Sequence, residues 1–171
     1  EGREHLPADG GYLLVSNHQS FLDIPIVAAA LPDRHVCFVA RESLARSRPL
    51  AWLMRRSGAI LIRRGASDRR ALSEMVEHLR AGDVVCVYPE GTRSADGTVG
   101  EFLPGALFAS KRARVPIVPT AIWGAHRALP RDAVVPRPAR ITIRFGEPVD
   151  GGAKDAMELA RESILGMIQQ L

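Results

Sequence analysis

The sequence has no apolar run that approaches the ~18 residues needed to span a bilayer as a helix. It shows no signal peptide, and it begins at Glu1 without a methionine, so an anchor in a trimmed upstream segment would not be visible. The only cysteines, Cys37 and Cys86, each lie in an apolar run, which favours buried, reduced thiols in a cytosolic setting over disulfides. Repeats, linkers and low-complexity tracts are also missing, which argues against a division into several domains.

The length and the hydrophobic content of the chain suffice for one sizeable hydrophobic core. With 171 residues and 46% hydrophobic content, we expect a single domain across residues 1–171. The net charge is +4, and of the 23 basic residues only Lys111 and Lys154 are lysines. Arginine favours fork-like recognition of phosphate or carboxylate. A GC-rich genome would produce the same arginine bias without any functional meaning.

Apolar runs alternate with segments of helical spacing, which predicts an α/β sandwich. Strands are expected at 12–15, 35–40, 59–62, 84–88, 115–124 and 139–145, and helices at 21–31, 67–80, 102–112 and 153–170. In the second of these helices, Ser67 can serve as N-cap and Gly82 suits the end. Pro116 and Pro119 cannot donate to a ladder, so we expect their strand to be an edge strand or interrupted.

His18 and Asp23 lie five residues apart, where a predicted strand ends and a helix begins. On a regular helix this spacing is about 140° beyond a full turn, so the two would not share a face. If His18 lies in the loop and Asp23 in the first helical turn, Asp23 could bind one imidazole nitrogen and leave the other as a base. The alternative is that His18 only caps the helix, together with Asn17 or Ser20.

Motifs for several other chemistries are missing. Ser20 and Ser16 do not lie in the G-x-S-x-G setting of a serine nucleophile, and no Gly-rich run ends in the Lys-Ser/Thr of a P-loop. The five histidines are scattered without a partnering acid or thiol pattern, so we predict no metal site.

Three polar clusters each follow a predicted strand: Asn17–Asp23, Arg63–Arg64 and Glu90–Arg93. Because sites in α/β sheets form beyond the carboxyl ends of strands, these clusters could converge on one pocket. Arg64 and Arg93 offer planar forks for a phosphate, Gly91 allows backbone amides to approach a ligand, and Thr92 supplies a hydroxyl. A base beside arginines suits deprotonation of a hydroxyl on a phosphorylated substrate.

The segment Arg41–Ser57 mixes arginines, Trp52 and aliphatic residues. This composition is typical of a surface that lies on an anionic membrane. A solvated helix packed on the core by its Leu and Met side chains would have the same composition, and both interpretations stay open.

Four blocks together resemble the glycerolipid acyltransferases, the lysophosphatidic acid acyltransferase family. The block Asn17–Asp23 resembles the family's H-x4-D block, Gly58–Arg64 its second, Tyr88–Ser94 its third and Val115–Ala121 its fourth. All four occur in the family's order, across roughly residues 12–124. One H-x4-D spacing is a weak signal, whereas four blocks in order are a specific one.

The resemblance implies a mixed, largely parallel central sheet flanked by helices. It implies that His18 takes a proton from the free hydroxyl of the acceptor, that Asp23 orients His18, and that the hydroxyl attacks the thioester of acyl-CoA or acyl-carrier protein. The substrate phosphate would be held by Arg64, Glu90, Gly91, Thr92 and Arg93, and Pro119 would shape the wall near the acyl chain. The expected acceptor is a lysophospholipid, 1-acylglycerol-3-phosphate, which would become phosphatidic acid. No cofactor and no nucleic acid are expected, and the expected location is the cytoplasmic face of the cell membrane, peripheral or anchored through a segment not shown.

Two positions depart from the family pattern. The second block often has Asp where this chain has Arg63, and the usual Phe-Lys-x-Gly after the third block is Phe102–Gly105 with Leu103 in place of Lys. Leu103 cannot bind an anion, so an acceptor such as another lysolipid or a glycolipid stays open. An alternative of a different class is a catalytically silent lipid-binding domain, against which the presence of both His18 and Asp23 argues.

Overall fold

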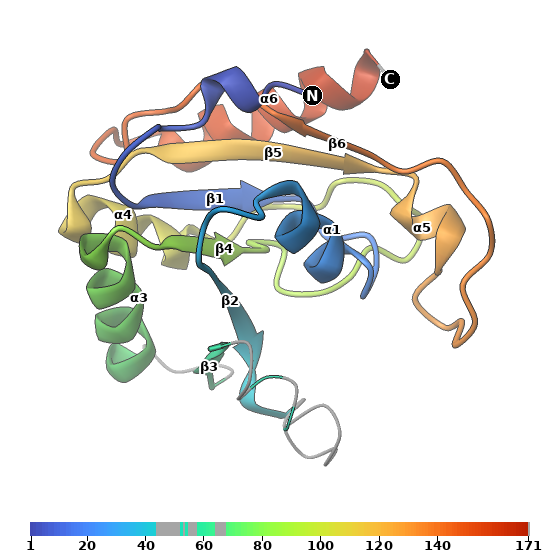
Figure 1. The fold of residues 1–171 in the computed structure, drawn as a ribbon, viewed down its shortest axis with the longest axis horizontal. Coiled ribbons are helices and arrows are strands. Elements are labelled where there is room, and N and C mark those ends of the chain that lie inside the picture. The colour runs from blue at the N-terminus through green and yellow to red at the C-terminus, as the bar shows by residue number, and fades with distance from the viewer. Residues whose placement is uncertain (44–51, 53, 55–57, 64–67, 171) are drawn as a thin grey trace.

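A computed structural model describes residues 1–43, 52, 54, 58–63 and 68–170 of the chain (Figure 1). Within these residues, six strands form one sheet in the order β3-β2-β4-β1-β5-β6. Their bounds are β1 Tyr12–Ser16, β2 Val36–Arg41, β3 Ile60–Ile62, β4 Val84–Val87, β5 Ile117–Trp123 and β6 Thr142–Phe145. Neighbouring strands from β3 to β5 pair in parallel, and only β6 runs antiparallel, against β5. The predicted mixed, largely parallel sheet with flanking helices is therefore confirmed.

Helices and short 3-10 turns cover the two faces of the sheet. Their bounds are η1 Arg3–His5, α1 Asp23–Ala30, α3 Arg69–Ala81, η3 Pro104–Ala106, α4 Leu107–Ala113, α5 Ala125–Ala128 and α6 Ala156–Gln169. The predicted helix at 102–112 is thus a 3-10 turn that opens at Pro104 and continues into α4. The sequence patterns did not predict η1 or α5. Within the described residues, no helix is both long enough and apolar enough to cross a membrane.

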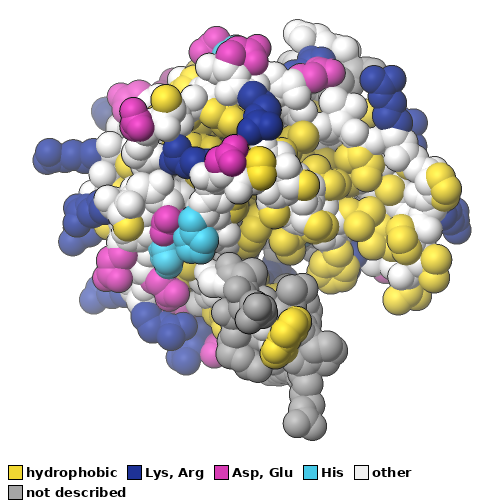
Figure 2. Space-filling model, viewed as in Figure 1, with side chains coloured by type: hydrophobic (Ala, Val, Ile, Leu, Met, Phe, Trp, Pro, Cys, Tyr) yellow, Lys and Arg dark blue, Asp and Glu magenta, His cyan; other side chains and the backbone are white. Residues whose placement is uncertain are grey.

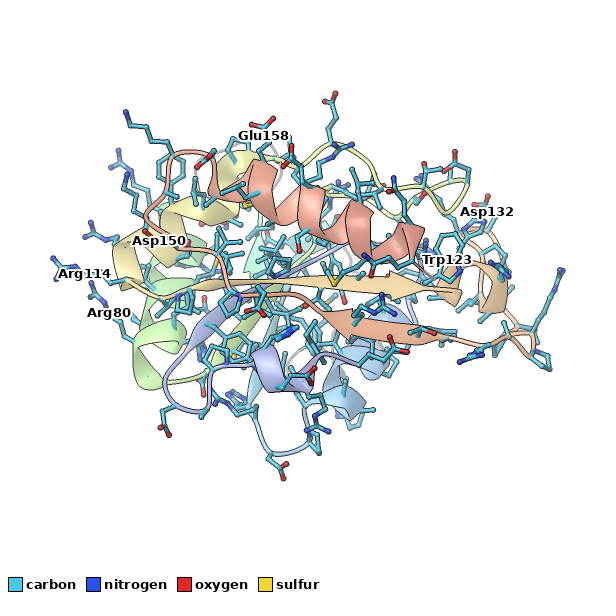
Figure 3. All side chains as sticks on the ribbon, turned by 90° about the horizontal axis from the view of Figure 1, so that it is seen from above. Arg80, Arg114, Trp123, Asp132, Asp150 and Glu158 are labelled. Carbon is cyan, nitrogen blue, oxygen red and sulfur yellow. The ribbon has the colours of Figure 1, made fainter. Side chains whose placement is uncertain are left out.

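Alternation along β1 divides the core into two layers. Leu13 and Val15 pack with the layer that contains α3, α4 and α6, and Tyr12 and Leu14 pack with the layer that contains α1 and α5. Both faces of β1 are therefore buried, as a central parallel strand requires. Figure 2 shows apolar side chains gathered on the surface over α1 and the segment after α5, and Figure 3 shows α6 lying along β5.

The ends of α3 illustrate how local sequence sets an element. The N-cap is Asp68, whose carboxylate accepts a hydrogen bond from the Ala71 amide at 3.1 Å. The predicted cap, Ser67, is one residue too early, and Ser67 itself lies outside the described residues. Gly82 ends the helix as predicted, since its φ of 96° is a left-handed conformation that glycine adopts without strain.

Of the two alternatives for the strand with the two prolines, the edge strand is wrong, whereas its pairing with the chain on the β6 side is interrupted. Strand β5 is internal, between β1 and β6, and Pro119 lies opposite Val15 of β1. The Ile117 amide donates to Val149 on the β6 side, and by alternation the nitrogen of Pro119 faces the same side. There the neighbouring chain has left the regular ladder, which covers Thr120–Trp123, so no partner needs the missing N–H.

Candidate active site

The parallel strands end at one edge of the sheet, and the predicted polar clusters gather there. His18 follows β1, Glu90–Arg93 follow β4, and Arg41 is the last residue of β2. Strand β1 lies next to β4, and β4 next to β2. Segments far apart in the sequence therefore lie side by side at the carboxyl edge, where sites of α/β sheets form.

His18 and Asp23 are in direct contact. His18 lies in the loop after β1 and Asp23 is the first residue of α1, and the distance from His18 Nδ1 to Asp23 Oδ2 is 2.8 Å. The same Oδ2 accepts hydrogen bonds from the amides of Gln19 at 2.7 Å and Ser20 at 2.8 Å. Because an ionised carboxylate only accepts, Nδ1 is the donor, which leaves Nε2 with its lone pair. Among the described residues Nε2 has no hydrogen-bond partner, and the His18 side chain is 15% exposed.

Buried polar side chains hold the loop between β1 and α1 in place. The side-chain amide of Asn17 donates to the Ile122 carbonyl at 2.9 Å and accepts from the Ile122 amide at 2.8 Å. These two bonds continue the pairing of β1 with β5 beyond the end of β1. Gln19 donates to the Gly97 carbonyl at 2.8 Å, and Ser20 donates to the Leu129 carbonyl at 2.8 Å. Such buried, satisfied groups restrict the loop to one arrangement, so the orientation of His18 is set before any ligand binds.

The third block holds the backbone and the ring of His18. The His18 amide donates to Glu90 Oε1 at 2.9 Å, and the Ser94 amide donates to the His18 carbonyl at 2.8 Å. The imidazole stacks on the Tyr88 ring, with centroids 4.1 Å apart and planes at 20°. The second oxygen of Glu90 accepts from the Gly100 amide at 3.3 Å. Burial raises the pKa of Glu90 above its usual 4.5, against the opposing effect of these two amide bonds.

Arg93 supplies a cation beside the His-Asp loop. Its guanidinium lies 3.8 Å from the centroid of the Phe21 ring and donates to the Arg131 carbonyl at 2.9 Å. Burial, followed by the charge of Arg131, lowers the pKa of Arg93. A guanidinium nevertheless stays charged at neutral pH, because its pKa begins so high. The arginine is thus positioned by an aromatic face and keeps further N–H donors for an anion.

A second cation, Arg41, was not predicted as a site residue. Its guanidinium donates to the carbonyl of Gly91, which itself adopts a left-handed φ of 65°. Thr92, the next residue, is exposed. The sequence did contain a usable signal, because Arg41 directly follows an apolar run, in the same way as the clusters that were selected.

Two further predicted positions remain, Arg64 and Pro119. Arg64 lies outside the described residues, and its neighbour Arg63 is exposed and paired with Glu42 at 3.1 Å. Pro119 is buried within β5. Most of the basic segment Arg41–Ser57 is also outside the described residues, although Trp52 is exposed.

Comparisons with known proteins place the chain among acyltransferases. A family model described as Acyltransferase matches residues 1–123. The 1-acyl-sn-glycerol-3-phosphate acyltransferase alpha of Mus musculus is 42% identical over 123 residues, which are 69% of this chain and 42% of the mouse protein. A lyso-ornithine lipid O-acyltransferase of Pseudomonas aeruginosa is 29% identical over 170 residues, which cover 88% of this chain and 64% of that protein.

A solved structure has the same fold along the whole chain. The crystal structure of the 1-acyl-sn-glycerophosphate (LPA) acyltransferase PlsC from Thermotoga maritima matches with a TM-score of 0.84 and 30% sequence identity. The match covers 99% of this chain and 70% of the Thermotoga protein. The chain spans less than half the length of the first curated relatives that it matches.

Proposed function

Because this chain belongs to the Acyltransferase family, we propose that it transfers a fatty acyl group from a thioester to the free hydroxyl of a lysophospholipid. The donor is acyl-CoA or acyl-carrier protein, the acceptor is 1-acylglycerol-3-phosphate, and the product is phosphatidic acid. The observation that carries the proposal is the His18–Asp23 contact of 2.8 Å, with Nε2 of His18 unbonded among the described residues at the carboxyl edge of the sheet. The thioester is a co-substrate, and the proposal includes no cofactor.

The proposed chemistry needs one base and its orienting carboxylate. Nε2 of His18 accepts the proton of the acceptor hydroxyl while the hydroxyl oxygen attacks the thioester carbonyl carbon. Asp23 holds Nδ1–H and stabilises the imidazolium that forms. When the tetrahedral intermediate collapses, the C–S bond breaks and the departing thiolate takes the proton from Nε2. The ester and the free thiol leave, and His18 returns to its neutral form.

The phosphate of the acceptor is assigned to the loop after β4. Arg93 is held against Phe21 with donors to spare, and Thr92 is exposed one residue before it. Arg41 lies against Gly91 and adds a second positive charge to the same loop. Glu90 receives a different role from the one expected, because both its oxygens already accept backbone amides. We assign it to the positioning of His18; Arg64 remains a candidate phosphate ligand.

The apolar surface beside the site suits contact with a membrane. After Asp23, helix α1 consists entirely of apolar residues, and its Pro25, Ala28 and Ala29 are exposed. Val134 and Val135, in the segment after α5, are 93% and 73% exposed. An apolar area of this kind beside a site for an amphipathic lipid favours peripheral binding to the bilayer that contains the acceptor. We propose the cytoplasmic face, where acyl-CoA and acyl-carrier protein are found.

The decisive assay offers labelled acyl-CoA and 1-acylglycerol-3-phosphate to the purified protein and measures phosphatidic acid. His18→Ala should lower the rate about 10²–10⁴-fold, the usual contribution of a general base. His5→Ala is the matched control, since His5 also contacts a carboxylate, Glu147, but lies in η1 and not in the loop after β1. Background transfer by the unaltered protein, or equal rates for it and His18→Ala, would contradict the proposal and favour a silent lipid-binding domain.

A second candidate function is transfer to a lysolipid without a phosphate monoester. It is favoured by Leu103, which is exposed where a cationic residue was expected, and by the similarity to a lyso-ornithine lipid O-acyltransferase. An acceptor panel separates the two candidates. A kcat/KM that is higher for lyso-ornithine lipid or a lysoglycolipid than for 1-acylglycerol-3-phosphate would establish the second candidate in place of the first.

Membrane contact is tested by flotation with vesicles of anionic phospholipid. The double variant V134S/V135S should bind about tenfold more weakly for each valine that enters the bilayer, from about 1.5 kcal/mol per buried side chain. Leu159→Ser is the matched control, because Leu159 is an exposed apolar residue on α6, in the other layer of the fold. If both variants bind like the unaltered protein, the assigned surface is wrong.

A further inference from the structure

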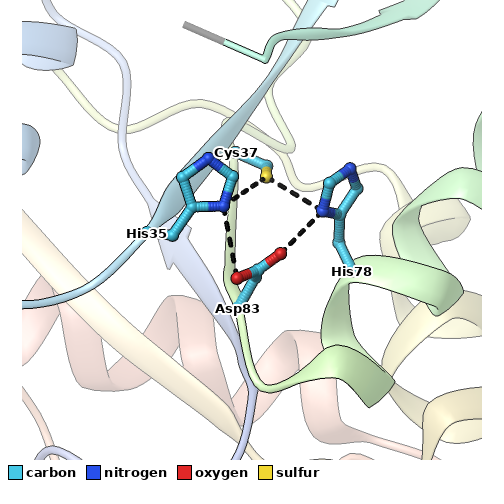
Figure 4. A group of neighbouring side chains, drawn as sticks. All are labelled: His35, Cys37, His78 and Asp83. Carbon is cyan, nitrogen blue, oxygen red and sulfur yellow. Dashed lines mark hydrogen bonds and ion pairs between the residues drawn. The ribbon is translucent and has the colours of Figure 1, made fainter.

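A second cluster of reactive side chains lies away from His18. His35 and Cys37 come from the start of β2, His78 from the last turn of α3, and Asp83 from the turn before β4 (Figure 4). These are the amino ends of β2 and β4, whereas His18 and Arg93 lie beyond the carboxyl ends. The cluster is therefore separated from the proposed reaction by the length of the strands, and the acyl transfer described above does not use it.

The four side chains bring their potential ligand atoms close together. Nδ1 of each imidazole, Sγ of Cys37 and the Asp83 carboxylate all lie within 4.8 Å of one another. Nδ1 of His78 lies 2.7 Å from Asp83 Oδ2, and Nδ1 of His35 lies 3.2 Å from the other oxygen, Asp83 Oδ1. Sγ of Cys37 is 3.3 Å from Nδ1 of His78 and 3.7 Å from Nδ1 of His35.

These separations match the edges of a tetrahedral coordination shell. Metal–ligand bonds of about 2.0–2.3 Å place the ligand atoms of tetrahedral zinc about 3.3–3.7 Å apart. Three of the four measured distances fall within or next to that range. The fourth, the His78–Asp83 contact of 2.7 Å, would have to lengthen by about 0.6 Å to reach that range.

Backbone hydrogen bonds hold the ligands in this arrangement. The Asp83 amide donates to the His78 carbonyl at 3.0 Å, in the turn that Gly82 permits after α3. The Val84 amide donates to the His35 carbonyl at 2.9 Å, which joins the starts of β4 and β2. Cys37 is fully buried in β2, opposite Val85. Cys37 and His78 thus lie on regular elements, and backbone hydrogen bonds hold His35 and Asp83 beside them, as a preformed site requires.

From this geometry we infer that His35, Cys37, His78 and Asp83 bind one zinc ion, which joins the end of α3 to the start of β2. Two imidazoles, one thiolate and one carboxylate are the ligand types that zinc takes in proteins. A single carboxylate among nitrogen and sulfur ligands disfavours Mg²⁺ and Ca²⁺, which prefer oxygen. The thiolate and the carboxylate together neutralise the two charges of the ion.

An entry path exists for the ion. The His35 side chain is 58% exposed and those of His78 and Asp83 are partly exposed, while Cys37 forms the closed end. Burial, followed by the charges of Asp83 and Glu74, raises the pKa of the Cys37 thiol to about 11. The metal-free thiol therefore keeps its proton, and zinc must release that proton to the solvent on binding.

No standard metal-binding motif in the sequence marks this site. The two ligand pairs are His35-x-Cys37 and His78-x4-Asp83, separated by forty residues or more, and neither spacing belongs to a familiar zinc motif. The prediction of no metal site rested on that linear pattern alone. Pairing of β2 with β4 is what brings the two pairs together.

The test titrates chelator-treated, metal-free protein with zinc in competition with a chromophoric chelator. We expect one equivalent to bind, and we expect Cys37→Ala to weaken binding by at least tenfold. Cys86→Ala is the matched control, because Cys86 is an equally buried cysteine on the adjacent strand that lies outside the cluster. Failure of the unaltered protein to bind one equivalent, or equal affinity of Cys37→Ala, would overturn the inference.

Cobalt substitution provides a second readout that reports the ligands directly. Co²⁺ in the unaltered protein and in Cys86→Ala should show a thiolate-to-cobalt charge-transfer band and the intense visible bands of a tetrahedral site. Both should be lost or altered in Cys37→Ala. If Cys37→Ala does not fold, His35→Gln replaces it, because an exposed side chain can change without loss of the core. Zinc should raise the Tm of the unaltered protein more than that of His35→Gln, and equal shifts would contradict the assigned site.

Discussion

The chain contains the H-x4-D spacing twice, and the two copies lie in opposite settings. His18 and Asp23 lie where a strand ends and a helix begins, and His78 and Asp83 lie where a helix ends and a strand begins. In both copies Nδ1 of the histidine meets Oδ2 of the aspartate, at 2.8 Å and 2.7 Å. The same spacing therefore produces the same contact by two different turns.

What surrounds each contact differs. Asp23 receives two backbone amides and one histidine, and the His18 ring stacks on Tyr88 beside Arg93. Asp83 is shared by two histidines, whose rings are 6.1 Å apart and tilted at 49°, and a thiol completes the group. The surroundings of the first pair suit the proposed base with its orienting carboxylate, and those of the second suit the proposed set of metal ligands. An H-x4-D spacing alone cannot distinguish them.

Asp23→Asn should have the largest effect and should separate the two pairs. An amide in place of the carboxylate can present its NH2 group to His18, which disfavours the tautomer that leaves Nε2 unprotonated. We expect acyl transfer to fall about 10²–10⁴-fold, while zinc stoichiometry stays at one. Initial rates and zinc titration of the same preparation measure both. Unchanged transfer would mean that the first pair, like the second, is not a catalytic dyad.

Arg93→Ala tests whether the phosphate of the acceptor binds to Arg93, next to the pair His18–Asp23. Loss of a charged hydrogen bond should cost about 1.5–3 kcal/mol, or about 10–150-fold in KM for a phosphate-bearing acceptor, with little change in KM for the thioester. Steady-state kinetics with each substrate varied in turn measure the two constants. The control is Arg80→Ala, since Arg80 contacts the Arg112 carbonyl on the helical layer. An equal rise in both KM values would contradict the assigned role of Arg93.

Glu90→Gln tests whether the hydrogen bond from the His18 amide to Glu90 positions His18 for the reaction. The pair His78–Asp83 has no such contact with Glu90. An amide can accept only one of the two backbone N–H groups that Glu90 now accepts. We expect kcat to fall about tenfold, equivalent to about 1.4 kcal/mol, with the KM values little changed. A change in KM for the acceptor with kcat unchanged would instead support contact between Glu90 and substrate.

The difference in stability between the unaltered protein and Glu90→Gln should also depend on pH. Because burial raises the pKa of Glu90 above its usual 4.5, the native state favours the protonated acid. The contribution of Glu90 to stability is therefore fullest below about pH 4.5 and declines as pH rises through the raised pKa. Glutamine does not titrate, so the wild-type advantage in unfolding free energy should be larger at pH 4 than at pH 7. Urea unfolding at both pH values measures the gap, and a gap that widens with pH would contradict the direction of this shift.

Tyr88 should give the smallest effect. Tyr88→Phe keeps the aromatic face that stacks on His18, and kcat should stay within about twofold. Tyr88→Leu removes that face, which in aromatic pairs is worth about 0.5–1.5 kcal/mol, and kcat should fall by about two- to tenfold. Circular dichroism and the Tm control for folding of both variants. If kcat falls as much in Tyr88→Phe as in Tyr88→Leu, the stacking of the Tyr88 ring on His18 does not account for the effect of Tyr88 on kcat.

Much of the fold and the family could be predicted because the signals are local. Each of the six apolar runs became a strand, and helical spacing located α1, α3 and α6 to within a few residues. The glycerolipid acyltransferase resemblance, based on four short blocks, is confirmed by the family model. The contact between His18 and Asp23 spans one turn, so nearby backbone geometry suffices to form it.

Other features depended on contacts between distant segments. The prolines near β5 suggested an edge strand or an interrupted one. Sheet order is decided by how whole strands pack, and β5 became an internal strand with an interrupted pairing on its β6 side. Glu90 suggested a substrate contact, whereas its partners are amides of His18 and Gly100 that no local pattern identifies. The secondary-structure propensity of a residue indicates whether it lies in a helix, a strand or a loop. It does not indicate which residues from distant parts of the chain it contacts.

The sequence by itself determined most of the elements, the family and the contact between His18 and Asp23, since each depends on residues close together in the chain. Tertiary structure alone decided that Glu90 and Ser94 hold the His18 backbone, that Arg41 joins the third block, and that His35, Cys37, His78 and Asp83 lie close together. These contacts depend on tertiary structure because the sheet is parallel. Each crossover returns the chain to the same edge, so residues far apart in sequence become neighbours only when the strands pair.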